Sequence, residues 1–339
     1  MTDTGAQLLQ AGEPLEAPGV AVGHTSTLLV DESRSDRLIG VDCWYPASMA
    51  DEPAAAYEVI PGVGFRAMAR SEAAPLAGAR PLVVFSHGRA GLRTSYVMLC
   101  EGLAARGFVV AALDHPGDTL LDWMMGTAAD DATNETQRVA DVRFVIDTLL
   151  SSAPLPAMTA VDVSRVAVVG HSYGGWTALA TAASDAPDPR IRAVAGLQPF
   201  ARSLSRQAIA RISVPTLLIA GERDATCPPA TDADRVTDTI TRDDAQRFDL
   251  AEAGHQACSD VGLYLELESQ VSGLPEIVAA FLGTMADQVT GRAGDPWRPT
   301  VGLHLRILGA WLGDVVGDRG GADELAAIAQ LPGVTARSS

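Results

Sequence analysis

RVAVVGHSYGGWTALATAA, residues 165–183, joins an apolar run to a helical pattern through a glycine-rich turn. The turn holds Gly170, Ser172 and Gly174 in the order G-x-S-x-G. Where a strand precedes this motif and a helix follows it, the serine hydroxyl stands in a strained turn above the carboxyl edge of a sheet. The flanking glycines fit such a turn, because a Cβ at either position would collide with adjacent elements. We therefore predict that Ser172 is a nucleophile at the start of a helix, whose dipole favours developing negative charge.

The chain on both sides of this turn alternates between short apolar runs and helical patterns. Further strand candidates are 81–86, 108–113, 191–197, 215–221 and 245–251, and helical stretches lie near 94–106, 134–150 and 275–285. This alternation indicates a mainly parallel sheet with helices on both faces. Together with the serine turn, it predicts an α/β protein of the α/β-hydrolase fold. Ligands of such sheets bind beyond the carboxyl ends of the strands.

The N-terminal part of the chain has a different pattern. Residues 1–19 are rich in Gly, Pro and Glu and predict a flexible arm. Residues 46–80 are rich in Ala and Pro and predict mostly irregular structure. Between them, 20–30 and 38–45 indicate an antiparallel hairpin at the edge of the sheet. We expect one domain over residues 20–339.

The C-terminal segment 297–339 contains VGLHLRILGAWLGDVV, an amphipathic apolar helix. We expect this helical extension to pack on the domain, with a dimer interface or a lipid-contacting surface as the alternatives. No uninterrupted stretch approaches the ~20 apolar residues of a membrane span, and the N-terminus lacks the charged and apolar regions of a signal peptide. We predict a cytoplasmic protein with no integral membrane segment. The net charge of −17 disfavours nucleic acid as a partner.

A nucleophilic serine needs a general base and an acid that orients the base. In this fold the chain order is serine, acid, histidine. His255 follows the last strand pattern on a glycine-containing loop, and we predict it as the base. Asp224 follows the strand 215–221 and is favoured as the acid over Glu222, which would continue that strand. Asp260 is a remote alternative and is expected on the surface near a helix start.

Ester hydrolysis passes through an oxyanion, which needs preorganised N–H donors. We assign one donor to the backbone of Tyr173, the residue after the nucleophile. The second is assigned to the backbone of Arg89 in the loop SHGRAG, residues 86–91, where His87-Gly88 matches the H-G of such loops.

The long connection 114–135 predicts a lid or a pocket wall at the carboxyl edge. Trp123 and Met124 are candidate contacts for the substrate, and His115 is a third. Ordinary packing is the alternative for each of these side chains.

The four cysteines show no metal-ligand spacing, so we predict no metal site. Cys43 and Cys100 lie in apolar patterns and are expected in the core. Cys227 and Cys258 each follow a predicted triad residue by three positions, so a disulfide between the two loops is conceivable. A reducing cytosol argues against that bond.

Several of these stretches together resemble one branch of the α/β hydrolases. They are PLVVFSHGRAGLRTSY (81–96), GFVVAALDHPGDT (107–119), NETQRVADVRFVIDTL (134–149), GHSYGG (170–175) and AGHQACSD (253–260). The chain is similar here to the platelet-activating-factor acetylhydrolase-like, dienelactone-hydrolase-related group. Arg89-Ala90 departs from that group, in which small or apolar residues are common. The dienelactone hydrolases proper use a cysteine nucleophile, whereas this turn carries Ser172.

The resemblance implies serine-dependent hydrolysis without a metal or an organic cofactor. We predict a carboxylic ester hydrolase that works through an acyl-enzyme on a small or lipid-like ester. One alternative is a cutinase-like polyester hydrolase. Others are a triad enzyme for carbon–carbon bonds, amides or haloperoxidation, and a non-catalytic binding protein on a hydrolase scaffold.

Overall fold

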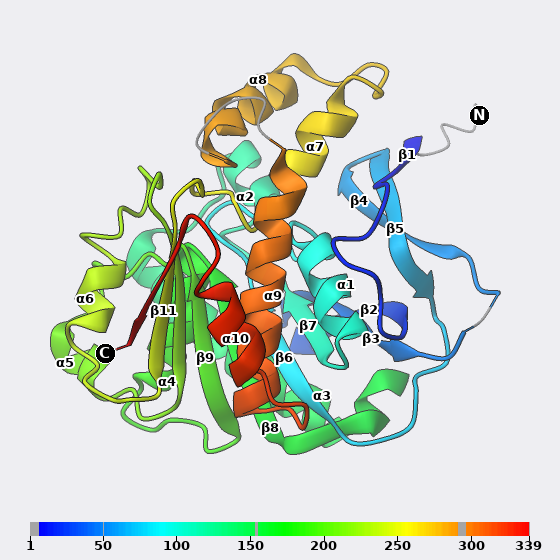
Figure 1. The fold of residues 1–339 in the computed structure, drawn as a ribbon. Coiled ribbons are helices and arrows are strands. Elements are labelled where there is room, and N and C mark those ends of the chain that lie inside the picture. Colours follow the sequence, from blue (N-terminus) through cyan, green and yellow to red (C-terminus); the bar gives the residue numbers. More distant parts are fainter. Residues whose placement is uncertain (1–6, 50, 153–154, 291–295, 339) are drawn as a thin grey trace.

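The computed structural model describes residues 7–49, 51–152, 155–290 and 296–338. Its strands form a twelve-stranded sheet in the order β1-β5-β2-β3-β7-β6-β8-β9-β10-β11-β12, with β4 paired to β5 (Figure 1). The strands are β1 (Gln7–Gln10), β2 (Ala21–Asp31), β3 (Arg37–Ala47), β4 (Ala54–Ile60), β5 (Val63–Ser71), β6 (Arg80–Ser86), β7 (Val109–Leu113), β8 (Val161–His171), β9 (Ile191–Leu197), β10 (Thr216–Gly221), β11 (Ala245–Leu250) and β12 (Val334–Ser338). The helices are α1 (Val97–Ala105), α2 (Leu120–Met125), α3 (Asp131–Ser152), α4 (Tyr173–Ala182), α5 (Arg206–Ala210), α6 (Ala233–Thr237), α7 (Val261–Glu268), α8 (Glu276–Met285), α9 (Trp297–Val315) and α10 (Ala322–Ile328).

The middle of the sheet is parallel, and the strand that follows it on either side is antiparallel to it. Strands β7, β6, β8, β9, β10 and β11 pair in parallel. Strand β3 pairs antiparallel with β7, and β12 pairs antiparallel with β11. This arrangement confirms the predicted α/β-hydrolase fold.

The central strands are apolar on both faces because helices cover both sides of the sheet. In β6, Val83 and Phe85 belong to one apolar cluster and Leu82 and Val84 to another. Alternate residues of a strand point to opposite faces, so these two clusters lie on either side of the sheet. Helices α1 and α9 contribute to the first cluster, and α3 and α4 to the second.

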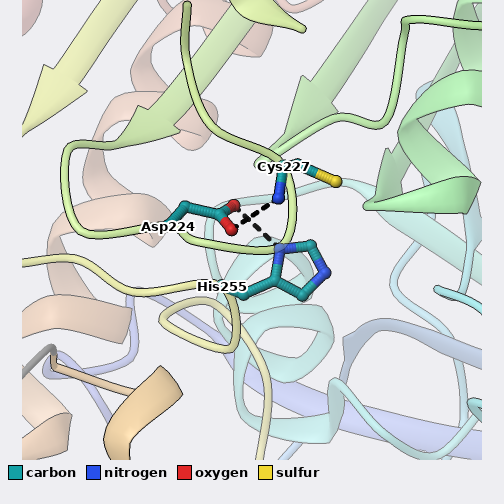
Figure 2. Close-up of side chains that lie close together, drawn as sticks. All are labelled: Asp224, Cys227 and His255. Carbon is teal, nitrogen blue, oxygen red and sulfur yellow. Dashed lines mark hydrogen bonds and ion pairs between the residues drawn. The ribbon is translucent and has the colours of Figure 1, made fainter. Parts of the chain in front are cut away.

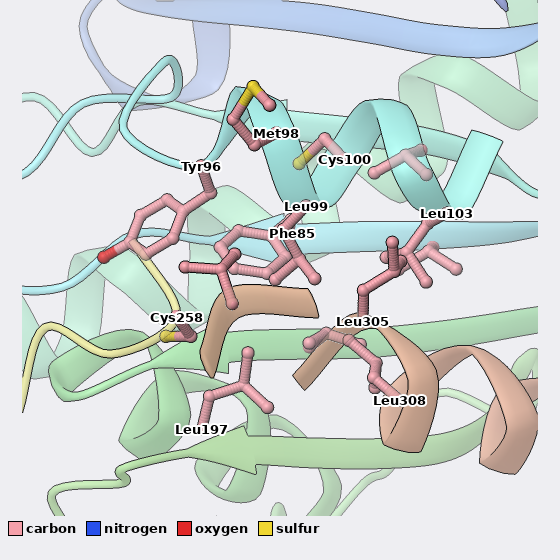
Figure 3. Packing of buried hydrophobic residues seen from close by; sticks show 14 of the residues in the cluster. Phe85, Tyr96, Met98, Leu99, Cys100, Leu103, Leu197, Cys258, Leu305 and Leu308 are labelled. Atoms are coloured by element: carbon pink, nitrogen blue, oxygen red, sulfur yellow. The ribbon is translucent and has the colours of Figure 1, made fainter. Parts of the chain in front are cut away.

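The C-terminal helix α9 packs on the domain, as predicted. Leu305 and Leu308 of α9 meet Leu103 of α1 above Phe85 of β6 (Figure 3). A Cβ on Gly102 would overlap the Leu305 side chain, so the glycine permits the close approach of the two helices. Among the described helices, none is both long and apolar enough to cross a membrane.

Two predictions for the N-terminal part are wrong. Residues 46–80 are not mostly irregular, because β4 and β5 form an antiparallel pair there. The arm 1–19 is not loose throughout, because Gln7–Gln10 pair in parallel with Val63–Arg66; residues 1–6 lie outside the described residues. The predicted hairpin 20–45 is present as β2 and β3, but β5 extends the sheet beyond it. These added strands lie on the same side of the molecule as α7 (Figure 1).

Candidate active site

Ser172 occupies the turn between β8 and α4 in a conformation that non-glycine residues rarely adopt. Its φ is 55° and its ψ is −118°. A Cβ on Gly170 would overlap the carbonyl oxygen of Gly174, and a Cβ on Gly174 would overlap that of Ser86. The glycines of the motif are therefore required by contacts within the turn and with the end of β6.

Ser172, His255 and Asp224 form one chain of hydrogen bonds. His255 Nε2 lies 2.9 Å from Ser172 Oγ, and His255 Nδ1 lies 2.8 Å from Asp224 Oδ2. Asp224 follows β10 and His255 follows β11, so neighbouring parallel strands deliver them to one edge. All three residues are at most 8% exposed. The structure thus brings together the three residues that the sequence analysis singled out as a triad.

The Asp224 carboxylate is fixed from both sides. Its Oδ1 accepts hydrogen bonds from the backbone N–H of Thr226, at 2.9 Å, and of Cys227, at 2.7 Å. Figure 2 shows the bond from Cys227 beside the contact with His255. Because the carboxylate accepts the Nδ1 proton of His255, the Nε2 atom facing Ser172 is left free to act as a proton acceptor.

A second histidine, His171, is hydrogen bonded to the backbone of His255. Its Nε2 lies 2.6 Å from the carbonyl oxygen of His255, and its Nδ1 lies 2.7 Å from the Tyr96 hydroxyl. Since a carbonyl oxygen only accepts, Nε2 donates and the hydroxyl donates to Nδ1. Burial lowers the pKa of His171 well below its ordinary value, so the ring stays neutral. The sequence analysis assigned no role to His171 or Tyr96; their partners are distant in the chain.

The loop of the predicted oxyanion donor lies directly beside Ser172. A Cβ on Gly88 would be 3.3 Å from Ser172 Cβ, so the Gly88–Arg89 peptide borders the nucleophile. Tyr173 is the first residue of α4, where a helical N–H has no partner within the helix. Both peptides thus lie beside Ser172, and the role of their N–H groups as oxyanion donors stays a prediction.

A cavity of about 470 Å³ opens over Ser172 and His255. Its apolar walls come mainly from three places: the β1, β4 and β5 strands, α7, and α8. Lining side chains from these elements include Leu9, Val59, Val63, Phe65, Leu267, Val278, Phe281, Leu282 and Met285. The sequence analysis did not foresee these walls, because β4 and β5 lie in the segment expected to be irregular.

Of the three substrate contacts predicted in 114–135, the structure places one in the cavity and two outside it. Trp123 lines the cavity, with Leu120 of the same helix α2. Met124 is not among the lining residues and is 49% exposed. His115 is 1% exposed and lies away from the cavity, hydrogen bonded to Ser86 Oγ and to a carboxylate of α3. The predictions for Met124 and His115 are therefore wrong, because one points to solvent and the other is part of the packed interior.

The conceivable disulfide is absent, since Cys227 and Cys258 are both free. Cys258 is buried in the apolar cluster under α1 and α9 (Figure 3), whereas Cys227 faces the triad. Burial and the nearby Asp224 raise the pKa of Cys227 to about 12, so its thiol is protonated. Asp224, Cys227 and His255 offer atoms within 4.8 Å of one another. Because the carboxylate is already occupied and the thiol is neutral, this group fits proton transfer better than metal binding.

Asp260 was expected on the surface and is instead fully buried. Its carboxylate accepts hydrogen bonds from the backbone N–H of Val97, at 2.5 Å, and of Met98, at 3.3 Å, at the start of α1. Burial raises its pKa to about 7. Asp260 therefore caps a helix and is not the acid that orients His255.

The fold and the arrangement of Ser172, His255 and Asp224 are those of the α/β-hydrolase superfamily. A family model described as PET hydrolase-like matches residues 75–269. The chain belongs to the PET hydrolase-like family.

Three relatives illustrate the range of the match. The chain is 30% identical to Cutinase est1 of Thermobifida alba over 176 residues, covering 52% of this chain and 53% of the relative. It is 30% identical to Cutinase cut1 of Thermobifida fusca over 151 residues, covering 44% and 41%. A weaker match, 25% identical over 185 residues and covering 42% and 40%, is the platelet-activating factor acetylhydrolase of Cavia porcellus. The chain spans about half the length of the curated relatives it matches.

One solved structure matches nearly the whole chain. It is a ferulic acid esterase from Streptomyces cinnamoneus, with a TM-score of 0.72 and 24% sequence identity, covering 97% of this chain and 99% of that one. At this identity the likeness supports the fold alone.

Proposed function

We propose that this protein is a serine-dependent carboxylic ester hydrolase of the cutinase type. The observation that carries the proposal is the hydrogen-bonded chain Ser172–His255–Asp224 facing an apolar cavity. The family match supports the same reaction. The cutinase relatives favour this reading over the acetylhydrolase-like one that the sequence first indicated.

In the proposed reaction, His255 Nε2 takes the proton of Ser172 while Oγ attacks the ester carbonyl carbon. The negative charge that develops on the carbonyl oxygen is received by the N–H groups of Arg89 and Tyr173. His255 then gives its proton to the leaving alkoxide, and the acyl group remains on Oγ. Water, deprotonated by His255, attacks the acyl-enzyme, and Ser172 regains its proton as the acid leaves. Asp224 holds the ring and stabilises its charged form in both steps.

The cavity favours an uncharged substrate with an apolar part. Only two of its described lining residues have an acidic, lysine or arginine side chain, and these are Arg89 and Glu268. Arg89 is paired with Asp131 at 2.6 Å and lies 4.5 Å from the centroid of the Tyr173 ring, so its charge is already engaged. Each methylene buried in such a pocket contributes about 0.8 kcal/mol. We therefore expect esters with an aliphatic acyl chain to be better substrates than acetyl esters.

The test is hydrolysis of p-nitrophenyl esters of increasing acyl length by the wild type and by Ser172→Ala. We expect wild-type kcat/KM to rise from acetyl to longer acyl groups, and activity to vanish in a folded Ser172→Ala variant. Near wild-type activity in that variant would refute the proposal. Preference for p-nitroanilides over the matching esters would favour an amidase instead.

Polyester is a second candidate substrate, because the matching family model is described as PET hydrolase-like. A polymer chain needs an open groove, whereas here α7 and α8 wall the cavity together with the N-terminal strands. Release of acid from a polyester film at a rate comparable to that from soluble butyrate esters would establish this alternative. We expect the soluble esters to be hydrolysed far faster.

A further inference from the structure

Arg138 of α3 is a fully buried cation that contacts the loop beside the nucleophile. It is 0% exposed, and its Nε donates to Asp118 Oδ2 at 2.8 Å. Burial lowers its pKa, but a guanidinium starts so high that it stays charged. The remaining donors of this cation do not meet another carboxylate. They reach the backbone of the loop that borders Ser172, and Nη1 also donates to Ser86 Oγ at 3.3 Å and to Thr177 Oγ1 at 3.5 Å.

The guanidinium holds two consecutive carbonyl groups of that loop. Its Nη1 donates to the carbonyl oxygen of His87 at 2.9 Å, and its Nη2 donates to that of Gly88 at 3.2 Å. The Gly88 oxygen also accepts hydrogen bonds from His87 Nδ1 at 2.6 Å and from the N–H of Gly91 at 3.1 Å. Three donors therefore converge on the carbonyl of the Gly88–Arg89 peptide.

Fixing these carbonyls also fixes the N–H groups of the same peptides. In a planar trans peptide, the N–H points opposite to the C=O. Both carbonyls face Arg138, so the N–H groups of Gly88 and Arg89 face the other side. The Gly88 N–H identifies that side, because it donates to the Tyr96 hydroxyl at 3.2 Å. Tyr96 is bonded to His171, the neighbour of Ser172 in the chain.

We propose that Arg138 is a positioning residue that aims the Arg89 N–H at the oxyanion. The inference rests on the proposed function and adds a residue that does not touch the substrate. Arginine suits this place because its planar fork can hold two acceptors at a set spacing, which an ammonium group cannot do. Without the fork, the His87 carbonyl would lose the bond from Nη1, and the Gly88 carbonyl would keep only the bonds from His87 Nδ1 and the Gly91 N–H, so the two peptides would be less firmly oriented.

Two variants test this role. In Arg138→Lys, the charge opposite Asp118 is kept and the fork is lost. In Arg138→Gln combined with Asp118→Asn, no unpaired charge is left in the interior, and the reference is the single variant Asp118→Asn. Arg143→Lys is the matched control on the same helix, since Arg143 donates to Ser184 and Ala186, which follow the C-terminal end of α4.

Activity should fall at the transition state and not in substrate binding. Complete loss of one oxyanion donor costs about 10²–10³ in turnover, so we expect misalignment in either variant to lower kcat about 10–100-fold. KM for p-nitrophenyl butyrate should change less than about 3-fold, because the apolar cavity is untouched. Arg143→Lys should keep wild-type kcat.

Two further readouts separate positioning from simple loss of structure. Rates are divided by the fraction of Ser172 that a fluorophosphonate titrates at its end point, which removes misfolded protein. Butylboronic acid, which forms a tetrahedral adduct on a nucleophilic serine, should bind more weakly by the same factor by which kcat falls. Folded, fully titratable variants with unchanged kcat and boronate affinity would overturn the role of Arg138. A wild type that neither hydrolyses esters nor reacts with the probe would instead overturn the proposed function.

Discussion

The catalytic edge of the sheet and the walls of the cavity above it are built in opposite ways. At the edge, Ser172, Asp224 and His255 are nearly buried. They are hydrogen bonded to one another, and Asp224 is also held by the backbone of the loop after β10. The walls come from peripheral elements, and α8 has no buried residue. Its Ile277 is 69% exposed and Phe281 is 39% exposed. In the proposed reaction, chemistry therefore depends on a buried, hydrogen-bonded centre, whereas the choice of ester depends on less tightly packed segments.

The largest effect is expected at the catalytic edge. Asp224→Asn keeps the shape of the side chain but stabilises neither the charged imidazole nor its required tautomer. We expect kcat to fall about 10³–10⁴-fold with little change in KM. Steady-state kinetics on p-nitrophenyl butyrate measure this. A loss smaller than about 10-fold would mean that groups other than Asp224 orient His255. The hydrogen bonds that hold the Asp224 carboxylate against His255 argue for the larger loss.

A smaller effect of a different kind is expected in the wall. Phe281→Ala removes an apolar surface from the cavity, so KM for octanoyl esters should rise about 10-fold while kcat for acetyl esters stays unchanged. Ile277→Ala is the matched control, since Ile277 lies on the same helix but is not among the lining residues. Equal effects of the two variants would contradict the assignment of α8 to the substrate cavity.

The stability of the fold should depend on pH through Asp260, which lies between the catalytic edge and the cavity wall. Asp260 precedes α7 and caps α1, and burial raises its pKa from 3.8 to about 7. The fold therefore favours the protonated form. Asp260 contributes its full stabilisation at pH values below its ordinary pKa of 3.8, and this contribution is lost as the pH rises through about 7.

We accordingly expect the Tm of the wild type to decrease relative to that of Asp260→Asn when the pH rises from about 5 to about 8. Thermal unfolding of both proteins by circular dichroism at several pH values measures the difference. Tm curves that stay parallel over this range would show that Asp260 does not change its protonation in the fold.

The smallest effect concerns the cysteines. Because all four are free, unfolded protein that has not been reduced should present four thiols to a titrating reagent. Added reductant should leave both the Tm and the activity unchanged. Two missing thiols would mean that the loops after β10 and β11 can be linked after all.

The triad could be predicted from the sequence because its signals are local. The serine turn lies between a clear strand and a clear helix, and Asp224 and His255 each follow an apolar strand in the order the fold requires. The walls of the cavity lack such signals. The short strand β1 pairs with a partner more than fifty residues away, and AAAYEVI in β4 has few large apolar residues.

The sequence does contain a pattern that indicates the buried polar side chains of α3 beneath the loop 86–91. Asn134, Arg138, Asp141 and Val145 recur at helical spacing, and all four are buried. A polar residue on the core-facing side of a helix must be paired there, which marks such a position for attention. Which partners Arg138 meets depends on the loops after β6 and β7, and no local pattern in α3 encodes those contacts.

The proposed reaction requires that His255 activates Ser172. A fluorophosphonate probe reacts with a serine only when its hydroxyl is activated, and mass spectrometry locates the adduct. We predict a single adduct on Ser172 in the wild type, and labelling slowed at least about 100-fold in a folded His255→Ala variant. An unlabelled Ser172, or labelling at an undiminished rate without His255, would contradict the account.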